Sequence, residues 1–185
     1  MHKYLVGSLT ALTMSFANAI MPVQAGEILE ILDPDRDACF SRTYSAAHLG
    51  RNPNQTVEYI RFAHLPSLKQ ETYNSLAVDD TADFMPYADI EVRFVGDKTI
   101  YGVEVICEIY SAQYCGVEGD GGVFDIRIQD NGSMLIDFRK HWGILVGTVD
   151  NIGRDVYLGD KSDDKLFRLD PIEPRDCHAI VNHNG

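Results

Sequence analysis

The residues best suited to chemistry lie in a glycine-rich acidic stretch, residues 115–122, with the sequence CGVEGDGG. Glu118 and Asp120 of this stretch, with Asp125 just after it, offer carboxylate oxygens of the kind that Ca²⁺ prefers. Ca²⁺ takes about six to eight oxygen ligands in proteins, and glycine carbonyl groups could supply several of them. Spacing alone does not show that the three carboxylates converge, so they are weak calcium candidates.

The same stretch does not predict a phosphate-binding loop. Successive glycines can cradle an anion, but Glu118 and Asp120 would repel it and no lysine follows. The histidines are scattered along the chain and lack the spacing of a zinc site. We therefore expect no cofactor.

Hydrolytic chemistry is an alternative with less support. The chain has no Gly-x-Ser-x-Gly motif for a serine nucleophile. Glu104, Glu108 and Asp137 could form a carboxylate pair of the kind that glycosidases use. Their place in alternating segments puts them on the outer face of a sheet, where a solvated surface is the default. An envelope hydrolase with surface carboxylates is thus the second hypothesis, and a calcium-stabilised structural module is the third.

The chain contains four cysteines, Cys39, Cys107, Cys115 and Cys177. An even number of cysteines behind an export signal indicates disulfides. We expect a local Cys107–Cys115 bond and a Cys39–Cys177 bond that ties the two ends of the domain together. A four-cysteine zinc site would need short paired spacings, which are absent.

The N-terminus has the features of a cleaved signal peptide. Lys3 precedes an apolar segment over residues 4–17, and small residues follow at suitable cleavage positions. Polar residues interrupt the segment, whereas a membrane anchor needs about 18 unbroken apolar residues. Cys39 is too distant to be a lipoprotein cysteine. We predict a signal peptide over 1–25, a single domain over 26–185, and a periplasmic or secreted location.

The chain is acidic, with a formal net charge of -12. Removal of residues 1–25 deletes Lys3 and no acid, which changes the charge to -13. Nucleic-acid binding requires clustered Lys and Arg, so this balance argues against a nucleic-acid partner. No segment after the signal peptide is long and apolar enough to span a membrane. The oligomeric state is not indicated.

Apolar and polar residues alternate along most of the chain. The pattern is clearest at 89–94, 101–109, 123–128 and 134–138, and it predicts antiparallel strands with one polar face. Further strand candidates lie at 56–65, 144–149, 155–158 and 165–169. About seven or eight short strands predict a mainly β fold, either an antiparallel β-barrel or a β-sandwich.

Two segments depart from this alternation. Residues 37–49 have apolar residues four apart, with Asp37 as a possible N-cap and Gly50 as a possible end, which predicts a short N-terminal helix. Residues 66–88 contain two prolines and three aspartates and are expected to form a long irregular connection.

The turn at residues 130–132 fixes the pairing of two strands. A two-residue loop would set charged residues opposite apolar ones. A three-residue loop, with Gly132 in the left-handed conformation, instead produces three apolar pairs: Ile128 with Met134, Ile126 with Ile136 and Phe124 with Phe138. It also sets Asp125 opposite Asp137, which a five-residue loop would avoid.

Several short motifs resemble a group of exported bacterial proteins, chiefly alphaproteobacterial, that have no known activity. They are Cys39, Arg42, Tyr44, His48-Leu49, Pro53-Asn-Gln55, Val57, the stretch 115–122, Phe167-Arg-Leu169 and Cys177. In that group a further cysteine stands at the position of Gly119, so its cysteine pairing could differ. The resemblance implies export and one domain. It implies no function. The acidic, disulfide-bonded β pattern by itself favours a non-catalytic binding protein for a small ligand or an envelope protein.

Overall fold

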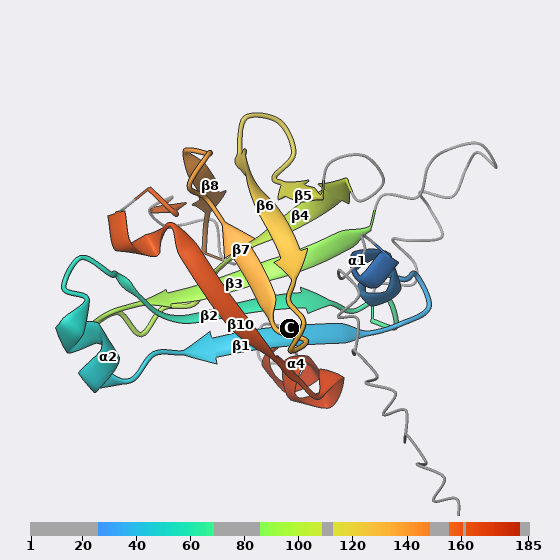
Figure 1. Ribbon diagram of the computed structural model, residues 1–185, viewed down its shortest axis with the longest axis horizontal. Helices are drawn as coiled ribbons and strands as arrows, with labels where there is room; N and C mark the ends of the chain where they lie inside the picture. Colours follow the sequence, from blue (N-terminus) through green and yellow to red (C-terminus); the bar gives the residue numbers. More distant parts are fainter. Residues whose placement is uncertain (1–25, 69–85, 109–112, 149–155, 161, 182–185) are drawn as a thin grey trace, which may run out of the picture.

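The structure is a computed structural model that describes residues 26–68, 86–108, 113–148, 156–160 and 162–181 (Figure 1). The predicted signal peptide over 1–25 lies outside these residues. Most of the predicted connection over 66–88 also lies outside them.

The described residues form strands and short helices. The strands are β1 (Ala38–Thr43), β2 (Val57–His64), β3 (Tyr87–Phe94), β4 (Tyr101–Glu108), β5 (Tyr114–Gly116), β6 (Gly122–Ile128), β7 (Met134–Asp137), β8 (Gly143–Val146), β9 (Val156–Leu158) and β10 (Leu166–Ile172). The helices are α1 (Gly26–Ile31), α2 (Ala46–Arg51), the 3-10 turn η1 (Ser162–Asp164) and α4 (Pro174–Val181).

These strands form one antiparallel sheet that closes into a barrel. The order is β5-β4-β3-β2-β1-β10-β7-β6-β8-β9, and β5 also pairs with β6, so that eight strands form the closed cylinder (Figure 1). The predicted antiparallel β fold is confirmed, and of its two forms the barrel is observed. The strand predicted at 144–149 corresponds to β8, and that at 155–158 to β9.

The interior of the barrel is filled by apolar side chains. Most of the residues predicted to point inward are fully buried: Ile90, Val92, Val105, Cys107, Phe124, Ile126, Met134, Ile136 and Phe138. The ring of Phe138 packs between those of Phe124 and Phe167, with centroid distances of 5.3 and 6.2 Å. Phe94, Val103 and Ile128, also predicted to face inward, are partly buried against this core.

The hairpin between β6 and β7 has the predicted three-residue loop. Ile128 is paired with Met134 and Ile126 with Ile136. The amide of Gln129 donates to the carbonyl of Ser133, which leaves residues 130–132 as the loop. Gly132 has a φ of 78°, as expected for the left-handed position. Asp125 does face Asp137, so the five-residue alternative is wrong.

The predicted helix over 37–49 is wrong in its first half. Residues 38–43 form β1, and helix α2 begins only after Ser45, whose side-chain oxygen accepts from the His48 amide at 3.2 Å. Phe40 faces the barrel core, while Cys39 packs in a second apolar cluster outside it. Both faces are therefore covered in the first half of β1, which removes there the polar alternation that marks the other strands.

Both predicted disulfides are present. Cys107 and Cys115 are directly opposed on β4 and β5, with a Cα–Cα distance of 4.0 Å. Cys39 and Cys177 join β1 to α4 across 6.3 Å between Cα atoms. The second bond holds the C-terminal helix against the outside of the barrel, where Cys39 and Cys177 are part of a small apolar cluster.

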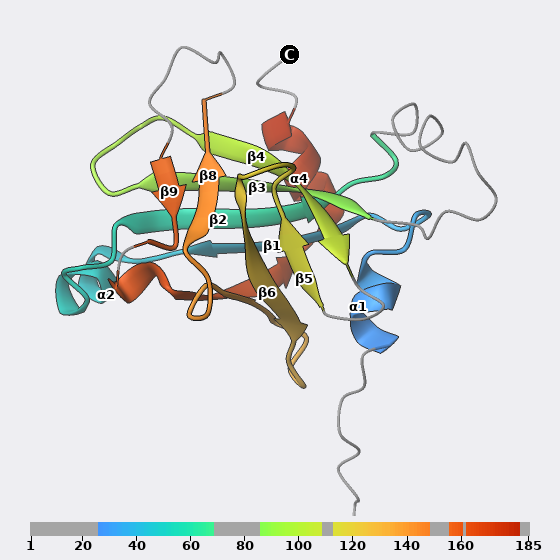
Figure 2. The same cartoon turned by 90° about the horizontal axis from the view of Figure 1, so that it is seen from above.

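Helix α1 lies at one end of the barrel (Figure 2). Ile28 and Leu32 from this segment are buried in the barrel core. The chain that follows α1 is held by His64, whose buried ring contacts the Tyr87 carbonyl at 2.7 Å and the Asp33 carbonyl at 2.9 Å. The start of the described chain is therefore part of the folded core.

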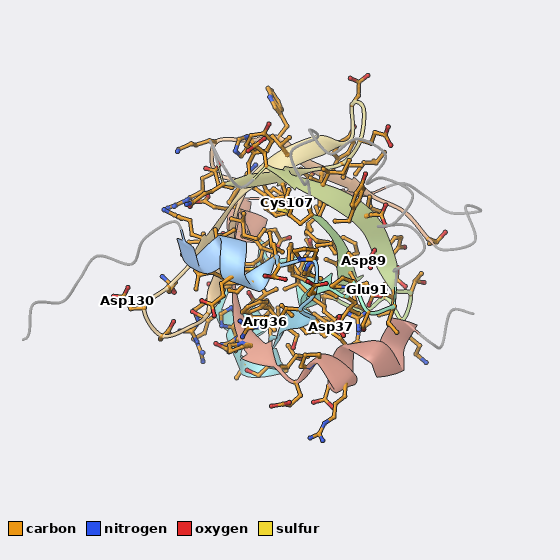
Figure 3. All side chains as sticks on the ribbon, turned by 90° about the vertical axis from the view of Figure 1, so that its right-hand side faces the viewer. Arg36, Asp37, Asp89, Glu91, Cys107 and Asp130 are labelled. Atoms are coloured by element: carbon orange, nitrogen blue, oxygen red, sulfur yellow. A yellow bond between two sulfur atoms is a disulfide. The ribbon has the colours of Figure 1, made fainter. Side chains whose placement is uncertain are left out.

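A charged pair is buried between the barrel wall and α4. Arg61 and Glu91 are opposed on β2 and β3 and are 0% and 8% exposed. Arg61 Nη2 forms an ion pair with Glu91 Oε1, and Arg61 Nη1 donates to the Cys177 carbonyl at 2.9 Å. Glu91 lies on the outer wall on the side of α4 (Figure 3). Its neighbours Ile90 and Val92 face the barrel core, so Glu91 points outward, where it is covered rather than solvated.

This pair is electrostatically costly. Arg61 Nε and Glu91 Oε2 have no hydrogen-bond partner in the described structure. Burial raises the pKa of Glu91, and the nearby Arg61 charge opposes that rise. Each residue thus depends on the other, since either charge alone would be desolvated without compensation.

We predict that Arg61→Met lowers the free energy of unfolding by about 3–5 kcal/mol, because it leaves Glu91 buried and unpaired. Urea unfolding at pH 7 measures the loss. The double variant Arg61→Met/Glu91→Leu should recover most of it, because an apolar pair replaces both charges. A double variant as unstable as the single one would contradict this assignment.

Candidate functional site

Exposed apolar side chains gather on one side of the barrel. Seven large apolar residues are exposed in the described chain: Leu68, Val95, Tyr114, Val123, Trp142, Tyr157 and Leu166. The last five come from adjoining strands and the loop between β7 and β8, and we call them the Trp142 face. Trp142 is 92% exposed and is the single tryptophan of the chain.

Strand register brings these residues together. One row across β5, β6, β7 and β10 consists of Tyr114, Asp125, Asp137 and Leu166. Two residues from Asp125 along β6, Val123 is opposite Gly143, which directly follows Trp142. Tyr157 is opposite Leu145 on the neighbouring pair of strands. The register therefore places the strand members of the Trp142 face on one outer side of adjoining strands, beside the loop that carries Trp142, although they are far apart in sequence.

The Trp142 loop, residues 138–142, connects β7 to β8, two strands that follow one another along β6. β7 and β8 pair with successive parts of the same edge of β6. β10 pairs with β7, and β9 pairs with β8. Figure 2 shows β8 and β9 next to each other. The loop leaves the sheet between β7 and β8, which places Trp142 outside the barrel wall.

Asp137 fixes the start of this loop. Its carboxylate accepts from the Arg139 amide at 3.0 Å, from Arg139 Nε at 2.9 Å and Nη2 at 2.6 Å, and from Arg127 Nη2 at 3.0 Å. These bonds lower the pKa of Asp137 to about 2 despite its burial. Asp137 is therefore ionised near neutral pH and holds two guanidinium groups in place.

The other end of the loop is also held. Asp125 Oδ1 lies 3.0 Å from His141 Nε2, and Lys165 Nζ donates to the His141 carbonyl at 3.4 Å. Gly143 has a φ of 109°, and a Cβ there would clash with the Leu158 carbonyl oxygen. The loop thus has bonds at both ends and a backbone that only glycine adopts readily, so Trp142 is presented on a rigid support.

The basic side chains beside Trp142 are more exposed than the carboxylates that they contact. The side chains of Lys140, Arg139 and Arg127 are 82%, 56% and 50% exposed. The carboxylates that they contact are less accessible, 28% for Asp125 and 7% for Asp137. An approaching molecule therefore meets cations first, even though the chain as a whole is acidic.

The predicted calcium candidates are not brought together as a ligand set. Glu118 and Asp120 are exposed in the turn between β5 and β6. Asp125 is directed toward His141 and Lys140. Among the described residues, no group of three or more His, Cys, Asp or Glu side chains is arranged to hold a metal ion.

The carboxylates proposed for a hydrolase lie on separate parts of the barrel. Glu104 and Glu108 are on β4, whereas Asp137 is on β7. Asp137 is engaged by two arginines, and its low pKa is unsuited to a general acid, which must be protonated at the working pH. This arrangement does not resemble the facing carboxylate pair of a glycosidase.

Sequence reasoning missed the Trp142 loop. A signal was present, because the run Phe138-Arg-Lys-His-Trp142 places three basic residues before an aromatic one between two predicted strands. Nothing in that run shows that Tyr114, Tyr157 and Leu166 lie beside it, since only the strand register brings them there.

Two open clefts lie elsewhere, at the tip of the β6–β7 hairpin, where Asp130 is seen in Figure 3. The larger, of about 480 Å³, is lined by Arg127, Leu135 and residues 128–131. The smaller, of about 240 Å³, lies between the hairpin and the α1 segment. Both are shallow and mostly polar, and neither is lined by Trp142.

No protein-family model matches the chain, and no curated protein or solved structure does either. Within the described residues, no helix has the length and apolar character required to cross a membrane. The candidate site therefore rests on the geometry of the Trp142 face.

We predict that Asp137→Asn destabilises the fold by about 2 kcal/mol at pH 7, because the depressed pKa of Asp137 favours the folded state. This contribution is complete above the ordinary carboxyl pKa of about 4 and is lost as the pH falls toward about 2. Urea unfolding at several pH values measures it, and the stability difference between wild type and variant should shrink over that range.

Trp142 provides a second readout for this variant. Fluorescence anisotropy of the single tryptophan should fall when the loop is released. The exposed Asp130→Asn in the adjacent hairpin is the matched control and should change neither quantity. Equal effects of the two substitutions would show that Asp137 does not hold the loop.

Proposed function

We propose that the protein is a non-catalytic binding protein, periplasmic or secreted, that recognises another envelope protein through the Trp142 face. The observation that carries this proposal is a 92% exposed tryptophan on a loop held at both ends. Exposed, pre-positioned Trp, Tyr and Arg side chains are typical of the residues that dominate protein interfaces.

Recognition outside the barrel agrees with the packing inside it. Large side chains occupy the interior, including Phe62, Phe124 and Phe138 at 0% exposure. A barrel that carries a small apolar ligand needs an interior cavity of several hundred Å³, roughly 300 or more. The surface is therefore the better candidate for binding than the interior.

An extracytoplasmic location is supported by two disulfides in one small domain. The signal-peptide pattern over 1–25 and the resemblance to exported bacterial proteins favour the same location. The hydrolase alternative has less support, because its carboxylates are dispersed or bound to arginines.

Site-specific photo-cross-linking tests this function. A photoreactive phenylalanine at Tyr157, 53% exposed on the Trp142 face, should give discrete protein adducts in the native envelope. The same probe at Val95, 52% exposed on another side, is the control for accessibility. Adducts of equal pattern and yield from both positions would contradict the proposal.

We predict that Trp142→Ala reduces adduct formation from position 157 by about 30-fold, which corresponds to about 2 kcal/mol, the scale of an interface hot spot. Adduct yield at limiting protein concentration measures the loss. The substitution should not alter the unfolding midpoint, because the side chain makes little contact with the barrel. Unchanged adduct yield would remove Trp142 from the binding surface.

A further inference from the structure

The Trp142 face presents a defined pattern to a partner. Its centre is one protruding indole, and its nearest exposed charges are Lys140 and Arg139. The acids that neutralise these cations lie below them in the barrel wall. Asp160, whose amide lies close to Gly143, is an exposed acid at the rim of the face, and Glu118 and Asp120 are exposed in the turn that leads into β6.

Resting on the proposed function of this face, we propose that it binds a folded protein through an apolar pocket that is rimmed by carboxylates. The pocket would enclose the Trp142 indole, and the carboxylates would contact Lys140 and Arg139. Charge complementarity supports this choice, because Lys140 and Arg139 belong to the same loop as Trp142 and their side chains are 82% and 56% exposed.

The geometry of Trp142 favours a pocket over a flat surface. An indole that is 92% exposed offers both faces and its edge, and only a concave site can bury all of them. The anchored loop means that little backbone freedom is lost on binding. Tyr157, Val123 and Leu166 are exposed on the strands next to the loop and would exclude water from the rim of the contact.

Arg139 retains donors for such a partner. Its Nε and Nη2 are bonded to Asp137, which leaves Nη1 available at the exposed side. Lys140 is 3.6 Å from Asp125, a loose contact for a side chain that is 82% exposed. Both cations can therefore reach a carboxylate of the partner without giving up their place in the loop.

A membrane surface fits this face less well than a protein pocket. Each Lys or Arg near an anionic leaflet strengthens binding only about fivefold, and a single apolar anchor gives marginal, reversible attachment.

Charge reversal at Lys140 tests the proposal. With the photoreactive residue at position 157 in the native envelope, Lys140→Glu should lower the adduct yield by about tenfold, because an attraction becomes a repulsion. Lys98→Glu changes the net charge equally at an exposed lysine outside the face and is the matched control. It should change the yield less than about twofold.

Two further measurements keep the test independent of folding. Arg139→Gln retains a hydrogen bond to Asp137 and removes the charge, and it should reduce the yield several-fold. Raising the ionic strength from about 0.1 M to about 1 M shortens the screening length from about 10 Å to about 3 Å and should lower the yield of the unmodified protein. Unfolding midpoints of all variants confirm that the fold is retained.

The outcomes separate this inference from the proposed function. Adduct formation by itself supports only the proposed function. A protein adduct that depends on Lys140 but not on Lys98 supports the carboxylate-rimmed partner. A protein adduct insensitive to all charge changes overturns it and leaves the proposed function standing. If the adduct yield from position 157 does not exceed that from position 95, both the inference and the proposed function are overturned. An adduct with the mass of a phospholipid overturns them as well and assigns the face to a membrane.

Discussion

Closure of the barrel depends on β5, a strand of three residues that pairs with β4 on one edge and β6 on the other. So short a strand makes few hydrogen bonds, and the disulfide between the directly opposed Cys107 and Cys115 holds its register. Gly122, with a φ of 92°, lies so close to the Gly143 carbonyl that a Cβ would clash. The glycine-rich acidic stretch thus forms the closing seam of the barrel.

The Trp142 face follows from that closure. Tyr114 reaches the row that contains Asp125, Asp137 and Leu166 only because β5 pairs with β6. The Trp142 loop then leaves the sheet where the partner of β6 changes from β7 to β8. A change in the pairing of β5 would move Tyr114 out of the face, so the disulfide-held seam and the binding surface are parts of one arrangement.

Local periodicity predicted most of the fold but little of the site. The apolar pairs of the β6–β7 hairpin could be predicted because adjacent strands share one short loop. Apolar residues four apart wrongly predict a helix over 37–49, and the strand β1 within it escapes detection because Cys39 and Phe40 are buried on opposite faces and give no alternation. Asp164, which is 1% exposed and binds the Thr56 amide at 2.9 Å, has a partner distant in sequence that no local pattern indicates.

Two arginine–carboxylate clusters show why net charge does not describe a surface. Arg61 and Glu91 are both covered, so neither contributes a charge that a partner can contact. Arg127 and Arg139 share Asp137, and there the carboxylate is buried while the guanidinium groups are half exposed. The sign of the charge that a partner can contact therefore depends on which member of each pair is buried. A chain of net charge -12 can therefore present a cationic face, and only the strand register determines where that face lies.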